Sequence, residues 1–434
     1  MTTNPPVGFR AARSVARKVV PSLPRFRRNL WLLLLTTFLV FVGIGTQAVI
    51  LNLYLVDLGY QADFLGLFAF VNTVAIGVAA LLAGQVSRRA GPRRILLVAV
   101  VTLGVSMGGL VVSTSPIPLL GLACLNGIAL AHFFVPGAPF VMDNARPEQR
   151  STAFAAYFAS QALASAVGSL VGGLLPTFVG GAVGPMRGGY VWTLVVSGIL
   201  AGAGVLPLIF ADDVPEKESR TSLGPLSSTV PSRRQMRRDL VWMAIANAFV
   251  AAATGFAIPF LNVFFDERLG ASTADIGVIF AIGSGAMVIA SLLGPAVGRR
   301  FGAVSAVVAC RALSAPIVIT LAFAPGVAAG ATLYVLRTLL FNLTWPIDNA
   351  FAMELVPPDF RSTLAALRST SWNLGWSLAS GLAGVMIVAF GFTSIFVASA
   401  LFLVVGSVVY LLGFRDRQLE APMRSPSATT SAET

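Results

Sequence analysis

Five ionisable residues of this chain lie well inside long apolar stretches, where burying a charge is costly. Four of the five fall in the second half of the sequence, and only one of them is an acid. Ionisable groups in such surroundings usually face a cavity or one another, so these side chains are the first candidates for ligand binding or proton transfer. They are His132, Arg311, Arg337, Asp348 and Arg368.

Aromatic residues accompany three of these charges at helical spacing. In one stretch, two aromatic residues lie four and eight positions after an arginine, and an aspartate lies eleven positions after it. In the next stretch, two tryptophans lie four and eight positions after another arginine. Residues at these intervals share one face of an α-helix. Aromatic walls suit an amphipathic organic molecule, and the arginines favour one with an anionic group. The predicted substrate site therefore includes Arg337, Phe341, Trp345, Asp348, Arg368, Trp372 and Trp376.

Asp348 is the only carboxylate well inside an apolar stretch, so it is also the candidate for proton coupling. Its stretch is expected to run inward and the next one outward, which places Asp348 and Arg368 at similar depths. Protonation of Asp348 would then release Arg368. Arg337 lies about 16 Å from Asp348 along the same helix and cannot pair with it. The Asp348–Arg368 pair is either part of a cavity or a packing contact, and both interpretations stay open.

The composition shows which elements must carry these residues. Hydrophobic residues make up 56% of the 434 residues and charged residues 11%, and the mean hydropathy is +0.82. Soluble proteins contain about 25% charged residues, so a soluble protein is excluded. At about 20 apolar residues per crossing, the sequence predicts an all-α membrane protein with about twelve transmembrane helices. The apolar stretches cover 30–56, 64–86, 94–113, 117–142, 152–179, 189–210, 240–265, 274–297, 303–323, 327–355, 362–390 and 392–414.

The net charge of +12 follows the topology. Arginines cluster before the first stretch and in alternate loops, whereas the opposite loops carry Arg187 and Arg268 among several acids. The positive-inside rule then places both termini in the cytoplasm. We therefore expect a multi-pass protein of the plasma membrane, or of the inner membrane in a bacterium, in which the basic charge orients helices and binds no nucleic acid.

The two halves of the sequence repeat each other at a constant offset of 211 residues. Arg88-Arg89-Ala90-Gly91 returns as Arg299-Arg300-Phe301-Gly302, and Arg150-Ser151-Thr152 returns as Arg361-Ser362-Thr363. Such a parallel repeat packs two six-helix bundles around an axis along the membrane normal, with a site between them near the midplane. The expected organisation is a basic cytoplasmic tail (1–29), a first bundle (30–210), a cytoplasmic linker (211–239), a second bundle (240–414) and a cytoplasmic tail (415–434).

The loop after the second stretch carries a family resemblance. Gly84-Gln-Val-Ser-Arg88-Arg89-Ala-Gly91-Pro92-Arg93 resembles the Gly-x-x-x-Asp-Arg-x-Gly-Arg-Lys motif of the major facilitator superfamily, and the resemblance covers roughly residues 30–414. It implies a twelve-helix secondary transporter. Arg88 stands where the family has an aspartate that helps to close the cytoplasmic side.

Two further motifs are typical of the family's proton-coupled exporters. Gly168-Ser-Leu-Val-Gly172-Gly173 is similar to their Gly-Pro-x-x-Gly-Gly motif, although small residues also simply allow close helix packing. Their arginine in the fourth helix is absent, since Asn126 stands there. Its repeat mate is Arg337, so the arginine lies in the other half of the chain and the exporters' usual proton-coupling scheme has no support from this motif.

Repeat symmetry also supplies candidate residues from the first half. Asn126 corresponds to Arg337, Tyr157 to Arg368 and Gln161 to Trp372. Both faces are amphipathic, which a shared central cavity explains, and Gln47 of the first helix adds a further polar group. His132 lies about 240° around the helix from Asn126 and is expected to be structural. Arg311, on a helix that is usually peripheral in this family, is expected to contact a neighbouring helix or to reach toward the membrane surface, without contacting the substrate.

The resemblance also implies a gate at the cytoplasmic ends of the helices. In folded members of the family, acidic residues at these helix ends lie near the repeated arginines. We expect charge pairs there that stabilise the outward-open state in place of the missing aspartate. The gate residues are Arg88, Arg89, Asp143, Arg299, Arg300 and Glu354.

The favoured function is a secondary active transporter, not an enzyme, that moves an amphipathic and anionic organic molecule by alternating access, as a proton-coupled exporter. No Walker-type phosphate loop occurs in the sequence, so ATP is not the expected energy source. A monomer with no cofactor and no metal site is expected. The alternatives are a passive uniporter or lipid flippase of the same fold, and a membrane receptor or scaffold that transports nothing.

Overall fold

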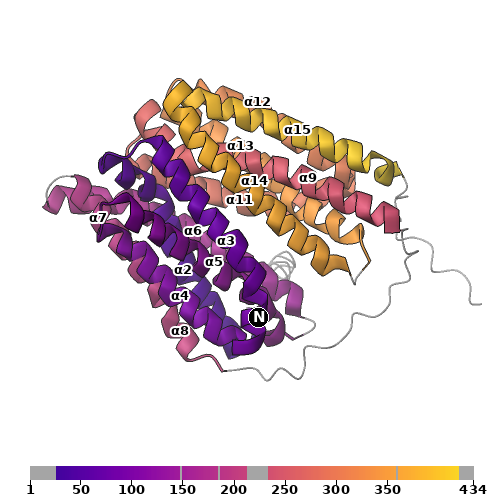
Figure 1. Cartoon of the computed structure of the whole chain (residues 1–434), viewed down its shortest axis with the longest axis horizontal. Coiled ribbons are helices and arrows are strands. Elements are labelled where there is room, and N and C mark those ends of the chain that lie inside the picture. Colours follow the sequence, from indigo (N-terminus) through magenta and orange to yellow (C-terminus); the bar gives the residue numbers. More distant parts are fainter. Residues whose placement is uncertain (1–25, 147–148, 184–185, 213–232, 358–359, 420–434) are drawn as a thin grey trace, which may run out of the picture.

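The computed structural model describes residues 26–146, 149–183, 186–212, 233–357 and 360–419, and the described chain is built from helices (Figure 1). The first half contains α2 (Arg28–Asp57), α3 (Ala62–Ala90), α4 (Pro92–Gly108), η1 (Gly109–Val111), α5 (Pro116–Asn144), α6 (Arg150–Val183), α7 (Met186–Ala203) and α8 (Val205–Ile209). The second half contains α9 (Arg233–Ala257), η4 (Ile258–Phe260), α10 (Leu261–Val263), η5 (Phe264–Arg268), α11 (Thr273–Phe301), α12 (Ala303–Ala322), α13 (Val327–Glu354), α14 (Arg361–Phe390) and α15 (Phe392–Leu419).

Twelve spans within the described residues are long and apolar enough to cross a membrane, which confirms the predicted fold class. The seventh span differs most from its expected bounds. Its helix begins at Arg233, inside the segment expected as a linker, and beyond Ala257 it continues through short 3-10, α and π turns to Arg268. Pro259 lies in the first of these turns, and a proline cannot donate the backbone hydrogen bond of a regular helix. The terminal segments 1–25 and 420–434 and linker residues 213–232 lie outside the described residues.

The repeat of the sequence is also a repeat of backbone conformation. Gly59 and Gly270, which are 211 residues apart, have φ of 93° and 70°, and Gly91 and Gly302 have φ of 84° and 82°. A positive φ is readily available only to glycine, so each pair marks the same turn in both halves. Helix packing repeats as well, because α2 packs against α6 and α7 while α9 packs against α14 and α15.

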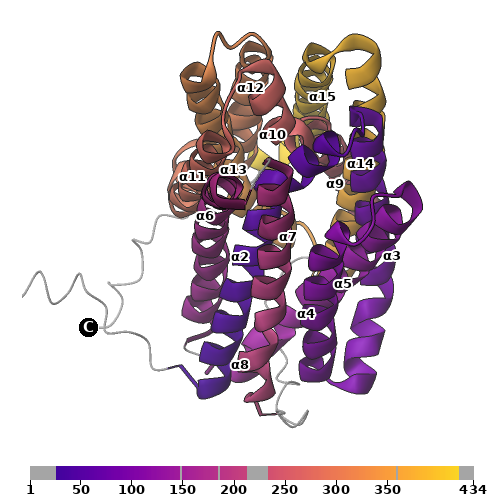
Figure 2. The same cartoon turned by 90° about the vertical axis from the view of Figure 1, so that its left-hand side faces the viewer.

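The two halves meet along two pairs of helices. The first pair is α3 with α14, and the second is α6 with α11. Figure 2 shows these pairs on opposite sides of the molecule. Each pair joins one helix of the first bundle to one helix of the second, so the other helices are free to line or support the space between the bundles.

The halves pack together at one end of the helices and separate at the other (Figure 1). We call these the acidic end, where α2 ends near Asp57, and the basic end, where α3 and α11 finish in arginine pairs. A single hydrophobic core at the acidic end includes residues of both halves, such as Leu53 and Phe264. Toward the basic end, one core belongs to the first half and others to the second. The described chain is therefore closed at the acidic end and open at the basic end.

Candidate functional site

The predicted partners Asp348 and Arg368 lie side by side in the basic half of the second bundle. Asp348 on α13 accepts a hydrogen bond at Oδ2 from Nη2 of Arg368 on α14, at 3.0 Å. Both residues are buried, with 4% and 8% of their surface exposed. The opposite directions of α13 and α14 bring the two residues to the same depth, so this buried ion pair joins the two helices.

Arg311 also belongs to this cluster, which the sequence did not indicate. Its Nη2 lies 3.2 Å from the same Oδ2 of Asp348, and only 4% of its surface is exposed. The guanidinium also lies over the Tyr410 ring, 5.2 Å from its centroid. Arg311 thus contacts a neighbouring helix, as expected, but it does so at the buried carboxylate and does not reach toward the membrane surface. Two guanidinium groups share one carboxylate.

Three more residues hold Arg368 in place. Asn349 accepts a hydrogen bond from Arg368 Nη2 at 3.1 Å, and Met243 Sδ lies 3.3 Å from Nη1. Asn247 of α9 donates to the backbone carbonyl of Arg368 at 2.7 Å and to Ser371 Oγ at 3.0 Å. These contacts tie α9 to α14 at the level of the ion pair.

The three predicted tryptophans form one continuous cluster beside the ion pair. Trp345 on α13 meets Trp372 on α14 edge to face, with ring centroids 5.2 Å apart. Trp372 in turn stacks on Trp376 at 6.1 Å. Trp345 keeps 44% of its surface exposed. The cluster therefore presents aromatic surface that a ligand can contact.

Arg337 lies further along α13, away from the ion pair. Its guanidinium lies over the Phe341 ring at 4.8 Å from the centroid, and 6% of its surface is exposed. In the part of the chain that the structure describes, no aspartate or glutamate forms an ion pair with it. A buried arginine without a carboxylate partner is a candidate binding group for an anion.

The first-half candidates are positioned differently from their repeat mates. Asn126 donates to Ser106 Oγ and accepts from Asn72 Nδ2, both at 3.1 Å, so it links α3, α4 and α5. Tyr157 is buried, and its hydroxyl packs against Gly137 of α5. Gln47 and Gln161 are half-buried. Two of the four candidates, Asn126 and Tyr157, therefore make contacts between helices of the first half.

The glycine motif on α6 packs helices closely in two directions. A Cβ atom on Gly172 would lie 2.5 Å from the carbonyl oxygen of Thr46 on α2, within the first half. A Cβ atom on Gly173 would lie 2.7 Å from the α-carbon of Gly277 on α11, in the second half. The motif thus serves close packing both inside its bundle and across the interface between the halves.

Two asparagines connect the halves at the acidic end. Asn262 donates to the carbonyl oxygen of Val49 on α2 at 3.0 Å, and its Oδ1 accepts from Asn52 at 3.3 Å. Asn52 also donates to the carbonyl oxygen of Pro259. The irregular turns after α9 expose this backbone to α2. We call these contacts the asparagine lock.

The predicted gate residues lie at the basic end. Arg89, Arg299, Arg300 and Glu354 are exposed and Asp143 is half-exposed, while the side chain of Arg88 lies outside what the structure describes. Within the described chain none of these five forms an ion pair. In this arrangement the basic ends of the two halves are apart, so the predicted pairing stays a prediction about the opposite state.

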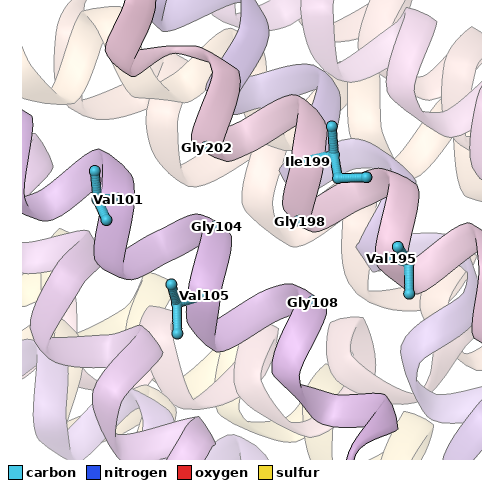
Figure 3. Close-up of a pocket in the computed structure, with 8 residues that line it drawn as sticks. All are labelled: Val101, Gly104, Val105, Gly108, Val195, Gly198, Ile199 and Gly202. Carbon is cyan, nitrogen blue, oxygen red and sulfur yellow. The ribbon is translucent and has the colours of Figure 1, made fainter.

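A shallow groove lies between α4 and α7, away from the predicted site (Figure 3). Its volume is about 300 Å³, and its lining is glycine, valine and isoleucine. Val105 and Ile199 are 59% and 64% exposed. The glycines allow close approach, since a Cβ atom on Gly104 would lie 2.8 Å from the α-carbon of Gly202. The groove is an apolar packing seam without a polar group to orient a ligand.

Comparison with known proteins agrees with this architecture. The family model of the Major Facilitator Superfamily matches residues 33–380. The chain belongs to the major facilitator superfamily. It is a multi-pass membrane transporter of that superfamily, whose members are transporters and not enzymes. The match begins inside α2 and ends inside α14, and it includes every predicted site residue.

Several superfamily members resemble the chain over most of its length. A protein described as a multi-drug resistance efflux pump PmrA homolog, from Lactococcus lactis subsp. lactis (strain IL1403), is 23% identical over 404 residues, which is 90% of this chain and 96% of that protein. A bacterial homolog of the human lysosomal transporter Spinster, in an inward-facing and occupied conformation, has a TM-score of 0.71 at 17% identity, over 92% and 98% of the two chains. A D-xylose-proton symporter has a TM-score of 0.72 at 14% identity, over 88% and 96%.

Proposed function

We propose that this transporter exports an amphipathic organic molecule with an anionic group by alternating access, and that proton binding at Asp348 drives the cycle. One observation carries the proposal. The buried carboxylate of Asp348 is ion-paired beside the tryptophan cluster, and it lies on the same helix as Arg337, a buried arginine with no carboxylate partner among the described residues. This combination offers a titratable group, an aromatic surface and an anion-binding group close to the interface between the halves.

The orientation of the protein follows from its charge. Arginines concentrate at the basic end, so by the positive-inside rule this end faces the cytoplasm. The described arrangement is then inward-open, with the asparagine lock closing the outer side. An exporter in this state is ready to take substrate from the cytoplasm or from the inner leaflet.

The substrate class follows from the side chains of α13 and α14. The Trp345–Trp372–Trp376 cluster suits a flat or apolar body, because aromatic rings contribute large contact areas. Arg337 suits a carboxylate, sulfate or phosphate group, because guanidinium binds such anions through paired hydrogen bonds. Gln47 and Gln161 supply half-buried polar groups from the first half, so we expect the substrate to touch both bundles.

The coupling mechanism follows from the shared carboxylate. Ionised Asp348 neutralises part of the charge on Arg311 and Arg368 and holds α12, α13 and α14 together. Protonation removes that negative charge and leaves two buried guanidinium groups without a counter-ion, which favours a different packing of these helices. The ionised, inward-open form is the one that remains after a proton has been released to the cytoplasm. The efflux pump among the relatives supports the outward direction of transport.

Transport into proteoliposomes tests this proposal. Purified protein would be assayed with a panel of amphipathic anions, neutral analogues and cationic drugs, with and without a pH gradient. We expect gradient-dependent movement of an anionic member. An Arg337→Gln variant should lose about 10-fold or more of its selectivity for the anion over its neutral analogue, since a hydrogen bond to a charged group contributes about 1.5–3 kcal/mol.

The matched control is Arg187→Gln, because Arg187 is exposed and pairs with Asp57 at the acidic end. This variant should keep the selectivity. Movement that ignores the gradient would instead indicate a passive uniporter, movement of fluorescent phospholipid between leaflets would indicate a flippase, and no movement of any compound would indicate a receptor or scaffold. Each of these results contradicts the proposed function.

A further inference from the structure

Three arginines of α9 line a pocket that the proposed transport cycle does not use. The pocket is open, it is lined by Arg234, Arg237, Arg238, Val241 and Trp242 of this one helix, and its volume is about 260 Å³. All three arginines are exposed. Within the described residues none of the three forms an ion pair. The pocket therefore concentrates positive charge at the basic end of one helix.

The pocket lies on the exposed face of α9. Arg234, Arg238, Val241 and Ile245 follow the i, i+4, i+7 and i+11 spacing of a single helical face. Val241 and Ile245 are 49% and 42% exposed, whereas Met243, roughly on the opposite face, is 1% exposed and belongs to the core of the second half. Exposed apolar side chains on a membrane-spanning helix are suited to contact with lipid acyl chains. The arginines continue this stripe beyond the apolar span, at the level of the lipid headgroups.

Trp242 gives the pocket a fixed wall. It packs against α15, where a Cβ atom on Gly413 would lie 2.9 Å from the Cβ of Trp242. Tryptophan is enriched at the boundary between bilayer and water, because its ring is apolar and its N–H is polar. Among the described residues, the buried Asp239 is the acid next to these arginines in the sequence, and one carboxylate cannot balance three guanidinium groups. The exposed Arg415 adds a further positive charge at the same end of α15.

We propose that this pocket binds the phosphate headgroup of an anionic phospholipid of the cytoplasmic leaflet. The guanidinium groups bind the phosphate oxygens, and an acyl chain runs along Val241 and Ile245. A basic pocket that adjoins an exposed apolar stripe fits a ligand with an anionic head and an apolar tail better than it fits a free ion. The inference rests on the proposed orientation of the protein, because anionic lipid must reach the basic end, but it does not depend on any substrate.

Tryptophan fluorescence tests the site directly. The full-length protein in detergent would be titrated with phosphatidylglycerol or phosphatidylcholine, each brominated on its acyl chains. We expect stronger quenching by the anionic lipid than by phosphatidylcholine, and we expect this excess to disappear in a Trp242→Phe variant. An equal response to both lipids, or an excess that survives Trp242→Phe, would overturn the proposal.

Thermal unfolding supplies a second measurement with a matched charge control. Unbrominated phosphatidylglycerol should raise the Tm of the wild-type protein, and a variant with Arg234, Arg237 and Arg238 all changed to Gln should lose most of that rise. A control with Arg27, Arg28 and Arg94 changed to Gln removes the same charge from exposed residues of the first half and should keep it.

Two results of this measurement would overturn the site. An equal loss in both variants would mean general electrostatic attraction, and a full rise produced by inorganic phosphate alone would mean that a free ion is the ligand. Neither assay measures transport, so failure here leaves the proposed function standing, and failure of the transport assay leaves this site standing.

Discussion

Arg368 on α14 and Asp348 on α13 form a buried ion pair in which Nη2 and Oδ2 are 3.0 Å apart. Arg311 on α12 reaches the same oxygen at 3.2 Å, so three helices converge on a single carboxylate atom. The Tyr410 hydroxyl of α15 is also buried beside this carboxylate. The cluster carries one positive charge in excess, and its stability therefore depends on the ionisation of Asp348.

This imbalance predicts unequal effects for two substitutions that each remove one charge. Asp348→Asn leaves two buried guanidinium groups without a counter-ion and should destabilise the protein by about 3–5 kcal/mol. Arg311→Gln leaves a one-to-one pair of Asp348 with Arg368 and should lower the Tm much less. Thermal unfolding in detergent compares the two variants, and equal losses would show that Asp348 is not shared in the way the geometry indicates.

Adjacent glycines on α6 predict two separable effects. Gly172→Ala places a Cβ atom against Thr46 inside the first half and should lower the Tm, since overpacking costs about 1–3 kcal/mol. Gly173→Ala places one against Gly277 of the second half and should separate α6 from α11. Spin-label distances across the acidic end should lengthen only for Gly173→Ala. A similar lengthening in both variants would contradict the separate roles of the two glycines.

The asparagine lock predicts a shift between conformations. Asn262→Ala removes the hydrogen bonds to Val49 and Asn52, so closure at the acidic end should weaken. Labels at Gln61 and Arg268, both exposed, report this end, and labels at Gln85 and Ala296 report the basic end. With Cys124 and Cys310 replaced, we expect longer distances at the acidic end and shorter ones at the basic end. Unchanged distributions at both ends would show that the lock does not hold the closed side.

The gate predicts a shift in the other direction. Glu354 is exposed in the described arrangement, and its proposed arginine partners would be reached only when the basic ends close. Glu354→Lys should therefore destabilise the outward-open state and raise the fraction of long distances between Gln85 and Ala296. Glu267→Lys at the acidic end is the matched control and should leave that distance unchanged. If Glu354→Lys also has no effect, the proposed charge pairs do not form.

The sequence predicted a large part of this structure for simple physical reasons. Hydropathy determines the spans, and the offset of 211 residues determines the repeat. The helical pitch and the opposite directions of successive helices determine the depth of Asp348 relative to Arg368. The tryptophan cluster also follows from pitch, because Trp372 and Trp376 are one turn apart on α14. These features depend only on regular periodicity along single helices.

The features that the sequence did not indicate depend on how helices rotate and pack against one another. Arg311 is predicted to contact a neighbouring helix or to reach toward the membrane surface, and the sequence does not indicate that this contact is the carboxylate shared with Arg368. Tyr410, which lies under the Arg311 guanidinium, carried no sequence signal. Tyr157 and Arg368 occupy equivalent positions of the repeat, yet Tyr157 packs against Gly137. Repeat symmetry conserves the position of the backbone and not the surroundings of each side chain. An excess of buried arginines over carboxylates was the one available hint that Asp348 would be shared.

Proton-driven transport by Asp348→Asn protein in proteoliposomes tests the central claim most directly. The wild-type protein and the variant would be reconstituted at equal amounts, and initial rates for the same amphipathic anion would be measured across a series of pH gradients. We predict that the wild-type rate rises with the gradient, whereas the variant transports only down the substrate's own gradient and shows no dependence on pH. A variant that retains the full pH dependence would contradict proton coupling at Asp348.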